Sequence, residues 1–253
     1  MQQGNCRLCT KFGQLTYEHV PPKVTFNKNT RYKSVPFLDY MKMPNPLESK
    51  FKGKVEQGGV GYYSLCGTCN SFLGSNYVRY YQEYSNTFIQ FAKKKEFNMF
   101  EFAIHNFNAL NVLKQIVSMF FSINDDTFSK NNRELAEFVL DPKSNKFPSQ
   151  FRVFNYLNTE GQLRNVPVMA LGNLSSKGVV VGTELAFPPL GHILTIDFDG
   201  QLPCHQEITS FKDYKFDETT SFDFKVYRLP TYLPILLDYR HKETIKKSID
   251  GSL

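Results

Sequence analysis

Cys6-Arg-Leu-Cys9 and Cys66-Gly-Thr-Cys69 are two Cys-x-x-Cys pairs with 56 residues between them. In a chain without a secretion signal, such pairs favour zinc over disulfide bonds. Four thiolates can surround one zinc ion tetrahedrally, and a closed four-thiolate site leaves no open coordination position. We therefore expect these cysteines to hold a structural Zn²⁺ ion that clamps the two ends of a long loop and replaces part of a hydrophobic core.

A second motif lies between the cysteine pairs. Glu18-His19-Val-Pro-Pro ends a short strand expected over residues 15–19, and Asn70 directly follows the second pair. A carboxylate and an amide oxygen can bind a hard divalent cation, and a histidine can take a proton from water near neutral pH. Adjacent strand residues point to opposite faces, so a metal ligand and a base can be neighbours. This chemistry is that of metal-assisted phosphodiester hydrolysis.

Over residues 4–80 the combined pattern CxxC…EH…CxxCN…G resembles the HNH superfamily of endonucleases, in its zinc-knuckle branch, which includes the phage endonuclease VII. The resemblance implies a ββα-metal fold. It implies that His19 is the general base and that Glu18 and Asn70 hold a catalytic Mg²⁺ or Mn²⁺ ion, beside the structural zinc on Cys6, Cys9, Cys66 and Cys69. The implied activity is hydrolysis of DNA phosphodiester bonds, with duplex DNA as the partner.

The sequence departs from the family's usual pattern at three positions. Gly61 stands where many members carry an Asn that orients the base histidine, and Leu73 stands where many carry a Lys. The helical metal-ligand position holds Asn70 rather than His. Three nearby side chains are candidates for the orienting group: Gln57, Tyr62 and Asn76.

Each proposed site residue also has a simpler interpretation. His19 can be a capping or packing histidine, Glu18 a surface charge, and Asn70 the N-cap of the helix that follows it. The corresponding alternatives for the protein are a catalytically silent zinc-dependent module that binds nucleic acid and an RNA-cutting or toxin-like nuclease. The site residues do not by themselves distinguish DNA from RNA.

The basic charge is concentrated in the first part of the chain. Residues 1–100 hold 14 Lys and Arg against 6 Asp and Glu, whereas residues 101–253 hold 16 against 18. A one-sided basic surface suits a polyanion. We expect a long loop or an insertion with little regular structure over 24–57. Lys23 and the basic part of that loop, 28–54, can contact a DNA backbone or can simply be solvated.

The remainder of the chain predicts an α+β fold. Hydrophobic periodicity indicates a helix that begins near residues 70–76 and runs through 77–95, helices over 105–123 and 132–140, and a basic helix over 242–249. Strands are expected over 151–157, 166–171, 177–187, 192–198 and 222–229, as a mainly antiparallel sheet. We expect two domains, a nuclease module over 1–95 and a domain over 96–253 for recognition, sensing or oligomerisation, through which a partner protein or a second copy would bind.

Other features add little. Cys204-His205 has no second partner motif, so Cys204 is interpreted as a small core or surface residue. The aromatic residues at helical spacing between 77 and 91 suit core packing better than base stacking. Residues 1–6 show no charged and apolar leader pattern, and no apolar run reaches membrane length, so we expect a cytoplasmic protein without a signal peptide. The resemblance also implies a context of restriction or antiviral defence in bacteria or phages.

Overall fold

The computed structural model describes residues 2–35, 39, 40, 42, 43, 45, 47, 53–94, 96–173 and 178–252. Its first part is a three-stranded antiparallel sheet in the order β1-β2-β5, made of β1 (Gln3–Asn5), β2 (Phe12–His19) and β5 (Gly61–Cys66). The strand predicted over 15–19 is thereby confirmed. Helix α2 (Gly67–Leu73) follows β5 directly.

The segment between β2 and β5 contains short regular elements where the sequence predicts a loop. A π-helical turn, η1 (Lys23–Asn27), follows the end of β2. Strands β3 (Tyr32–Ser34) and β4 (Lys54–Glu56) then pair with each other. The predicted long loop is therefore partly wrong, because a strand pair closes its base. Pro36, Pro44, Pro46, Lys50 and Lys52 of this stretch lie outside the described residues.

One predicted helix start is close and another is wrong. The helix expected to begin near residues 70–76 begins slightly earlier, at Gly67, and it continues through η2 (Gly74–Val78) into α3 (Arg79–Ala92). Residue 95, its expected end, lies outside the described residues. The helix expected from residue 105 begins later, as α4 (Ala109–Ile123), because residues before it form strand β6 (Met99–Phe107). Alternating burial in β6 supplies a strand-like pattern that merges with the apolar face of α4.

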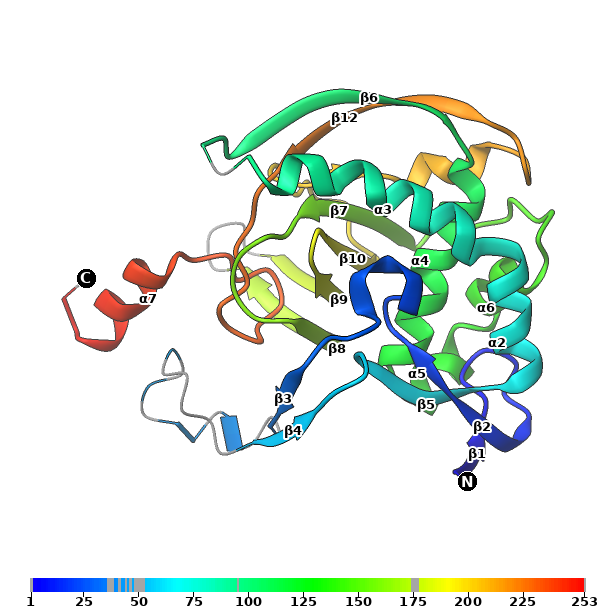
Figure 1. Cartoon of the computed structure of the whole chain (residues 1–253), viewed down its shortest axis with the longest axis horizontal. Helices are drawn as coiled ribbons and strands as arrows, with labels where there is room; N and C mark the ends of the chain where they lie inside the picture. Colours follow the sequence, from blue (N-terminus) through cyan, green and yellow to red (C-terminus); the bar gives the residue numbers. More distant parts are fainter. Residues whose placement is uncertain are drawn as a thin grey trace.

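Helix α4 is the centre of the molecule. Every residue of it from Ala109 to Ser122 is buried, which is the pattern of a helix covered on all sides. Helices α5 (Asp126–Asn131) and α6 (Arg133–Leu140) follow it and pack beside it (Figure 1). The prediction of a helix over 132–140 is confirmed by α6, whereas α5 was not expected.

The second half of the chain forms one antiparallel sheet in the order β11-β7-β10-β9-β8. Its strands are β7 (Phe151–Leu157), β8 (Arg164–Asn173), β9 (Gly178–Phe187), β10 (Leu190–Ile196) and β11 (Gln206–Glu207). They confirm the predicted strands, although residue 177 lies outside the described residues. A 3₁₀ turn, η3 (Thr209–Asp213), leads to β12 (Thr220–Tyr227), which pairs with β6. The α+β class and the mainly antiparallel sheet are thus confirmed.

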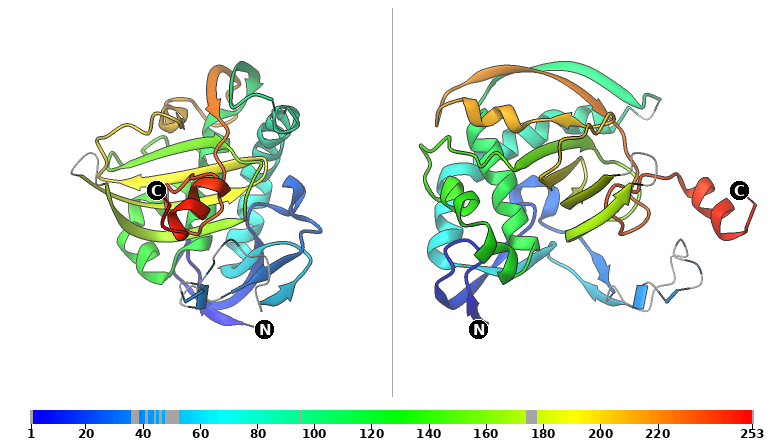
Figure 2. Two further views of the ribbon diagram at one scale, coloured as in Figure 1. Left: turned by 90° about the vertical axis from the view of Figure 1, so that its left-hand side faces the viewer. Right: turned by 180° about the vertical axis from the view of Figure 1, so that it is seen from behind.

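One hydrophobic cluster runs through both halves of the chain. It joins Leu8 and Tyr77 from the first part to Phe120 of α4 and Leu194 of the large sheet. The ribbon β6–β12 arches over α3, and α7 (Lys242–Ile249) projects to one side, at the left of Figure 1 (Figures 1 and 2). No helix within the described residues has both the length and the apolar character to span a membrane. The division into two domains at residue 95 stays a prediction.

Candidate functional site

The four predicted zinc ligands lie together. Cys6 and Cys9 come from the turn between β1 and β2, Cys66 ends β5, and Cys69 lies in the first turn of α2. Their sulphur atoms all lie within 4.8 Å of one another, and those of Cys9 and Cys66 are 3.8 Å apart. A tetrahedral zinc site with Zn–S bonds of about 2.3 Å requires sulphur–sulphur distances of about 3.8 Å. The cluster can therefore hold a metal ion such as zinc.

The thiols of this cluster affect one another's ionisation. The Cys69 thiol donates a hydrogen bond to the sulphur of Cys6, which lowers the pKa of Cys6 to about 4. The same interaction raises the pKa of Cys69. A bound dication stabilises thiolates and releases their protons, so a crowded group of this kind favours metal binding as the pH rises.

His19 ends β2, opposite Gly61 of β5. Its Nε2 atom lies 3.0 Å from the carbonyl oxygen of Gly58, and its ring meets the edge of the Tyr17 ring at a centroid distance of 5.2 Å. A carbonyl oxygen can only accept a hydrogen bond, so Nε2 carries the proton. The lone pair on Nδ1 is then free to accept a proton, as a general base requires.

The orienting group of His19 is therefore a backbone carbonyl and not one of the three side chains suggested by the sequence. Asn76 donates instead to the carbonyl of Phe72, and the Tyr62 hydroxyl accepts from Asn165. No described contact joins Gln57 to the histidine. Sequence reasoning could not find Gly58, because a backbone acceptor leaves no residue-type signal.

Glycines close the space around His19. Gly59 has a φ of 109°, and a Cβ atom there would lie 2.7 Å from Cδ2 of His19. A Cβ at Gly61 would lie 2.2 Å from the carbonyl oxygen of Glu18. The family's usual Asn therefore does not fit at position 61 without a shift of the backbone, which gives a physical reason for the departure.

Restoring that family residue is expected to harm this protein. Gly61→Asn should lower the free energy of unfolding by about 1–3 kcal/mol, because the new side chain is forced against the backbone of β2. Denaturant titration measures the effect. Gly13→Asn, in β2 with open space around its Cβ position, is the matched control and should change stability little. Equal stability of the two variants would contradict the crowding at Gly61.

The carboxylate of Glu18 is buried and unpartnered. Only 8% of the residue is exposed, and no hydrogen bond or ion pair to its side chain occurs among the described residues. Burial raises its pKa to about 7. The interpretation of Glu18 as a surface charge is therefore wrong. A buried carboxylate without a partner is stabilised when a cation approaches it.

Because the pKa of Glu18 is raised, we expect the stability of the protein to depend on pH when no divalent cation is added. The folded state keeps the proton up to about pH 7, whereas the unfolded chain releases it near 4.5. Wild-type stability should therefore fall as pH rises through this window, by up to about 3 kcal/mol. Glu18→Gln removes the titrating group. The variant should therefore become more stable relative to wild type as the pH rises from 4 to 8. Chemical unfolding at both pH values measures this, and parallel pH curves would refute it.

Asn70 is held against β2 from the helix side. Its Nδ2 atom donates to Oγ1 of Thr16 at 3.1 Å, and the Thr16 hydroxyl donates to the carbonyl of Leu65. The amide is thereby oriented, and its Oδ1 atom has no hydrogen bond among the described residues. Asn70 is not the N-cap of α2, because Cys66 occupies that position, so the capping interpretation is wrong.

The structure places the expected cation ligands on neighbouring elements but adds no further acid. Glu18 lies two residues after Thr16 on β2, and Asn70 contacts that same strand. Within the described part of the chain, the cysteine cluster is the one group of three or more His, Cys, Asp or Glu side chains that can share a metal ion. A cation on Glu18 and Asn70 would keep several water ligands, as Mg²⁺ commonly does.

Asn27 is a site residue that the sequence did not reveal. Its side chain is fully buried; Nδ2 donates to the carbonyls of Pro21 and Val60. Its Oδ1 accepts from the backbone N–H of Val60. These bonds fix the turn after His19 to the start of β5. An isolated Asn in a polar stretch gives no signal of such a role.

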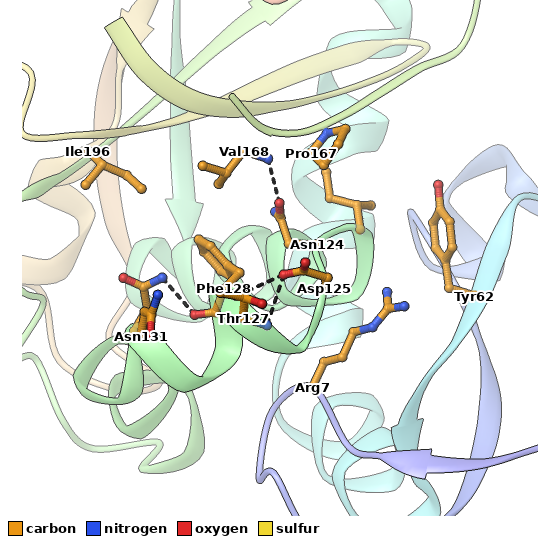
Figure 3. A pocket seen from close by; sticks show the side chains of 12 residues that line it. Arg7, Tyr62, Asn124, Asp125, Thr127, Phe128, Asn131, Pro167, Val168 and Ile196 are labelled. Carbon is orange, nitrogen blue, oxygen red and sulfur yellow. Dashed lines mark hydrogen bonds between the residues drawn. The ribbon is translucent and has the colours of Figure 1, made fainter. Parts of the chain in front are cut away.

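The first part of the chain is anchored to the central helices. Arg7, between the first two cysteines, donates to the carbonyl of Ser122 in α4 at 2.6 Å. Arg133 of α6 donates back to the carbonyl of Leu8. Beside this contact lies a cavity of about 680 Å³, whose lining includes both Arg7 and Asp125 (Figure 3). The cysteine-bearing turn is thus fixed on the hydrophobic core.

The remaining histidines and Cys204 lie outside this site. His192 is buried, which lowers its pKa to about 3, and it contacts the Tyr81 hydroxyl. His205 contacts the Tyr239 hydroxyl, and His241 is the N-cap of α7. Cys204 is exposed, in agreement with its interpretation as a core or surface residue.

Comparisons with family models, with curated proteins and with solved structures found no match to this chain.

Proposed function

We propose that this protein is a metal-dependent endonuclease of the HNH type that hydrolyses phosphodiester bonds in duplex DNA. The observation that carries the proposal is the pairing of two features at the end of β2. His19 is oriented by the Gly58 carbonyl with Nδ1 left as a proton acceptor, and the buried Glu18 carboxylate beside it has no partner. A fixed base next to a mostly buried acid that has no partner among the described residues suits metal-assisted hydrolysis.

In the proposed reaction, His19 accepts a proton from the water that attacks phosphorus. Glu18 and Asn70 would hold a Mg²⁺ or Mn²⁺ ion, for which carboxylate and amide oxygens are suitable ligands. When bound, this ion would stabilise the developing charge on the phosphate and the leaving oxygen. Thr16 positions Asn70, since it occupies the amide nitrogen and leaves the oxygen available. Asn27 positions the segment that carries Gly58.

The four cysteines have a structural role in this proposal. Their distances suit Zn²⁺, and four thiolates leave no open position for a substrate or a water ligand. A zinc ion there would tie the turn after β1 to the junction of β5 and α2. Both strands that carry the proposed site would depend on it.

DNA is proposed as the substrate because of the charge around the site. Residues 1–100 carry an excess of eight positive charges, from 14 basic against 6 acidic side chains. Lys23 and Lys28 line an open hollow of about 590 Å³ next to the end of β2. Lysines arranged in this way suit a phosphate backbone, whose neutralisation supplies much of the affinity of nucleic-acid-binding proteins.

Cleavage of supercoiled plasmid by the purified, zinc-loaded chain tests the proposal. Mg²⁺ or Mn²⁺ should produce nicked or linear DNA, EDTA should stop the reaction, and excess Mg²⁺ added afterwards should restore it. Single-stranded DNA and RNA of matched length, tested in parallel, identify the substrate class. Faster cleavage of RNA than of duplex DNA would show that RNA, and not duplex DNA, is the substrate.

A catalytically silent zinc module that binds nucleic acid is the second candidate. The observation in its favour is that, among the described residues, no group of three or more His, Cys, Asp or Glu side chains includes Glu18, whereas the four cysteines form such a group. A folded, zinc-containing protein that binds duplex DNA in a salt-dependent way, yet leaves plasmid intact with every divalent cation tested, would support this candidate over the nuclease.

A further inference from the structure

The turn formed by residues 23–28, directly after the His19 motif, has an unusual conformation. Phe26 adopts φ 66° and ψ 1°, a left-handed conformation that is unfavourable for a bulky side chain. Its ring is nevertheless 45% exposed, and Val24 is 50% exposed. The strained backbone therefore does not serve to bury these apolar side chains in the core. It presents them to solvent.

The turn is held rigidly in this conformation. The Thr25 hydroxyl donates to the carbonyl of Pro22 at 2.7 Å, and the fully buried Asn27 side chain makes three hydrogen bonds to the surrounding backbone. Residues 23–27 also pack against α3 (Figure 1). Buried polar residues thus alternate with exposed Lys23, Val24, Phe26 and Lys28.

The turn is adjacent to the proposed base. A Cβ atom placed on Gly59 would lie 2.2 Å from the backbone oxygen of Asn27 and 2.7 Å from Cδ2 of His19. Both residues therefore contact the same glycine. A nucleic acid that lies over Lys23, Phe26 and Lys28 would pass beside the His19 ring.

We propose that Phe26 stacks on a base of duplex DNA that it helps to unstack, while Lys23 and Lys28 contact the flanking phosphates, and that this contact sets the phosphodiester bond against His19. This inference rests on the proposed function. Exposed aromatic rings suit base faces, and apolar wedges are a known way for proteins to open a base step. The charge of the two lysines complements phosphate.

The experiment uses full-length protein carrying His19→Ala, which should cut DNA too slowly to disturb a binding measurement, and a duplex that contains the fluorescent base 2-aminopurine. Unstacking of this base raises its fluorescence. Binding of the His19→Ala protein should raise the signal several-fold. Adding Phe26→Ala should remove the rise and weaken binding by roughly 5- to 150-fold, the range that stacking on one base provides. Phe12→Ala, which removes another exposed ring, at 74% exposure, is the matched control and should change neither.

Two further variants separate stacking from folding and from charge. Phe26→Gly suits the positive φ of this position, so it should stay folded and still abolish the fluorescence rise. The double variant Lys23→Ala, Lys28→Ala should bind DNA more weakly. The slope of the logarithm of the binding constant against the logarithm of salt concentration should fall in magnitude by about 2, while the fluorescence of the bound state stays high.

The outcomes separate this inference from the proposed function. If the His19→Ala protein binds duplex DNA without a fluorescence rise at any label position, or if Phe26→Ala leaves the rise intact, the role of Phe26 is wrong and the nuclease proposal stands. If the folded protein does not bind duplex DNA at all, the DNA substrate fails and the inference fails with it.

Discussion

His19→Ala is expected to reduce plasmid cleavage by about 10²–10⁴-fold, the usual contribution of a general base. The reason is the hydrogen bond from Nε2 to the Gly58 carbonyl, which leaves Nδ1 as the proton acceptor. DNA binding and thermal stability should change little, because the ring is only half-buried at a strand end. Rates of supercoil loss under single-turnover conditions measure the effect.

Two controls make this result specific. His241→Ala removes an exposed histidine at the start of α7, away from the site, and should leave cleavage unchanged. Free imidazole added to His19→Ala protein should restore part of the activity if His19 transfers a proton. Wild-type activity in the His19 variant would show that another group is the base.

Cys69→Ala is expected to remove one zinc equivalent and to unfold the first part of the chain. Structural zinc contributes about 10–16 kcal/mol in zinc-finger peptides, which is as large as the whole stability of a typical domain. Because Cys69 joins α2 to the turn between β1 and β2, its loss releases the sheet that carries Glu18 and His19. Cleavage should then be lost even with excess Mg²⁺.

Zinc content by elemental analysis, together with circular dichroism and proteolysis, measures this second effect. Cys204→Ala is the matched control, because Cys204 is exposed and outside the cluster. It should keep the zinc, the fold and the activity. A Cys69→Ala protein with unchanged zinc content and unchanged unfolding would refute metal binding by the four cysteines.

Local patterns predicted much of the fold. The apolar runs and turn residues around β7 and α6 gave their positions closely, because short-range hydrophobic patterning and helix-ending residues determine such elements. The prediction was wrong where two elements share one apolar stretch. β6 precedes α4 with only Asn108 between them, so the sequence pattern merged the end of the strand with the helix.

In the candidate site, too, some residues could be predicted from the sequence and others could not. Its chemical groups were visible in the sequence because Cys, His and Glu residues at defined spacing have few other uses together. Its supporting groups were not visible. Thr16, which holds Asn70, is separated from it by 54 positions, and the Asn27 side chain bonds to Val60 across 33. Such contacts depend on which strands pair and in which register.

By itself, the sequence determined the two cysteine pairs, the Glu18-His19 motif, the basic charge of the first part and the α+β class. Only the tertiary structure decided that the four thiols meet, that Glu18 is buried without a partner, and that a backbone carbonyl orients His19. The physical reason is that residue type fixes which chemistry a side chain can perform, whereas burial and backbone hydrogen bonding arise from packing between segments distant in the chain.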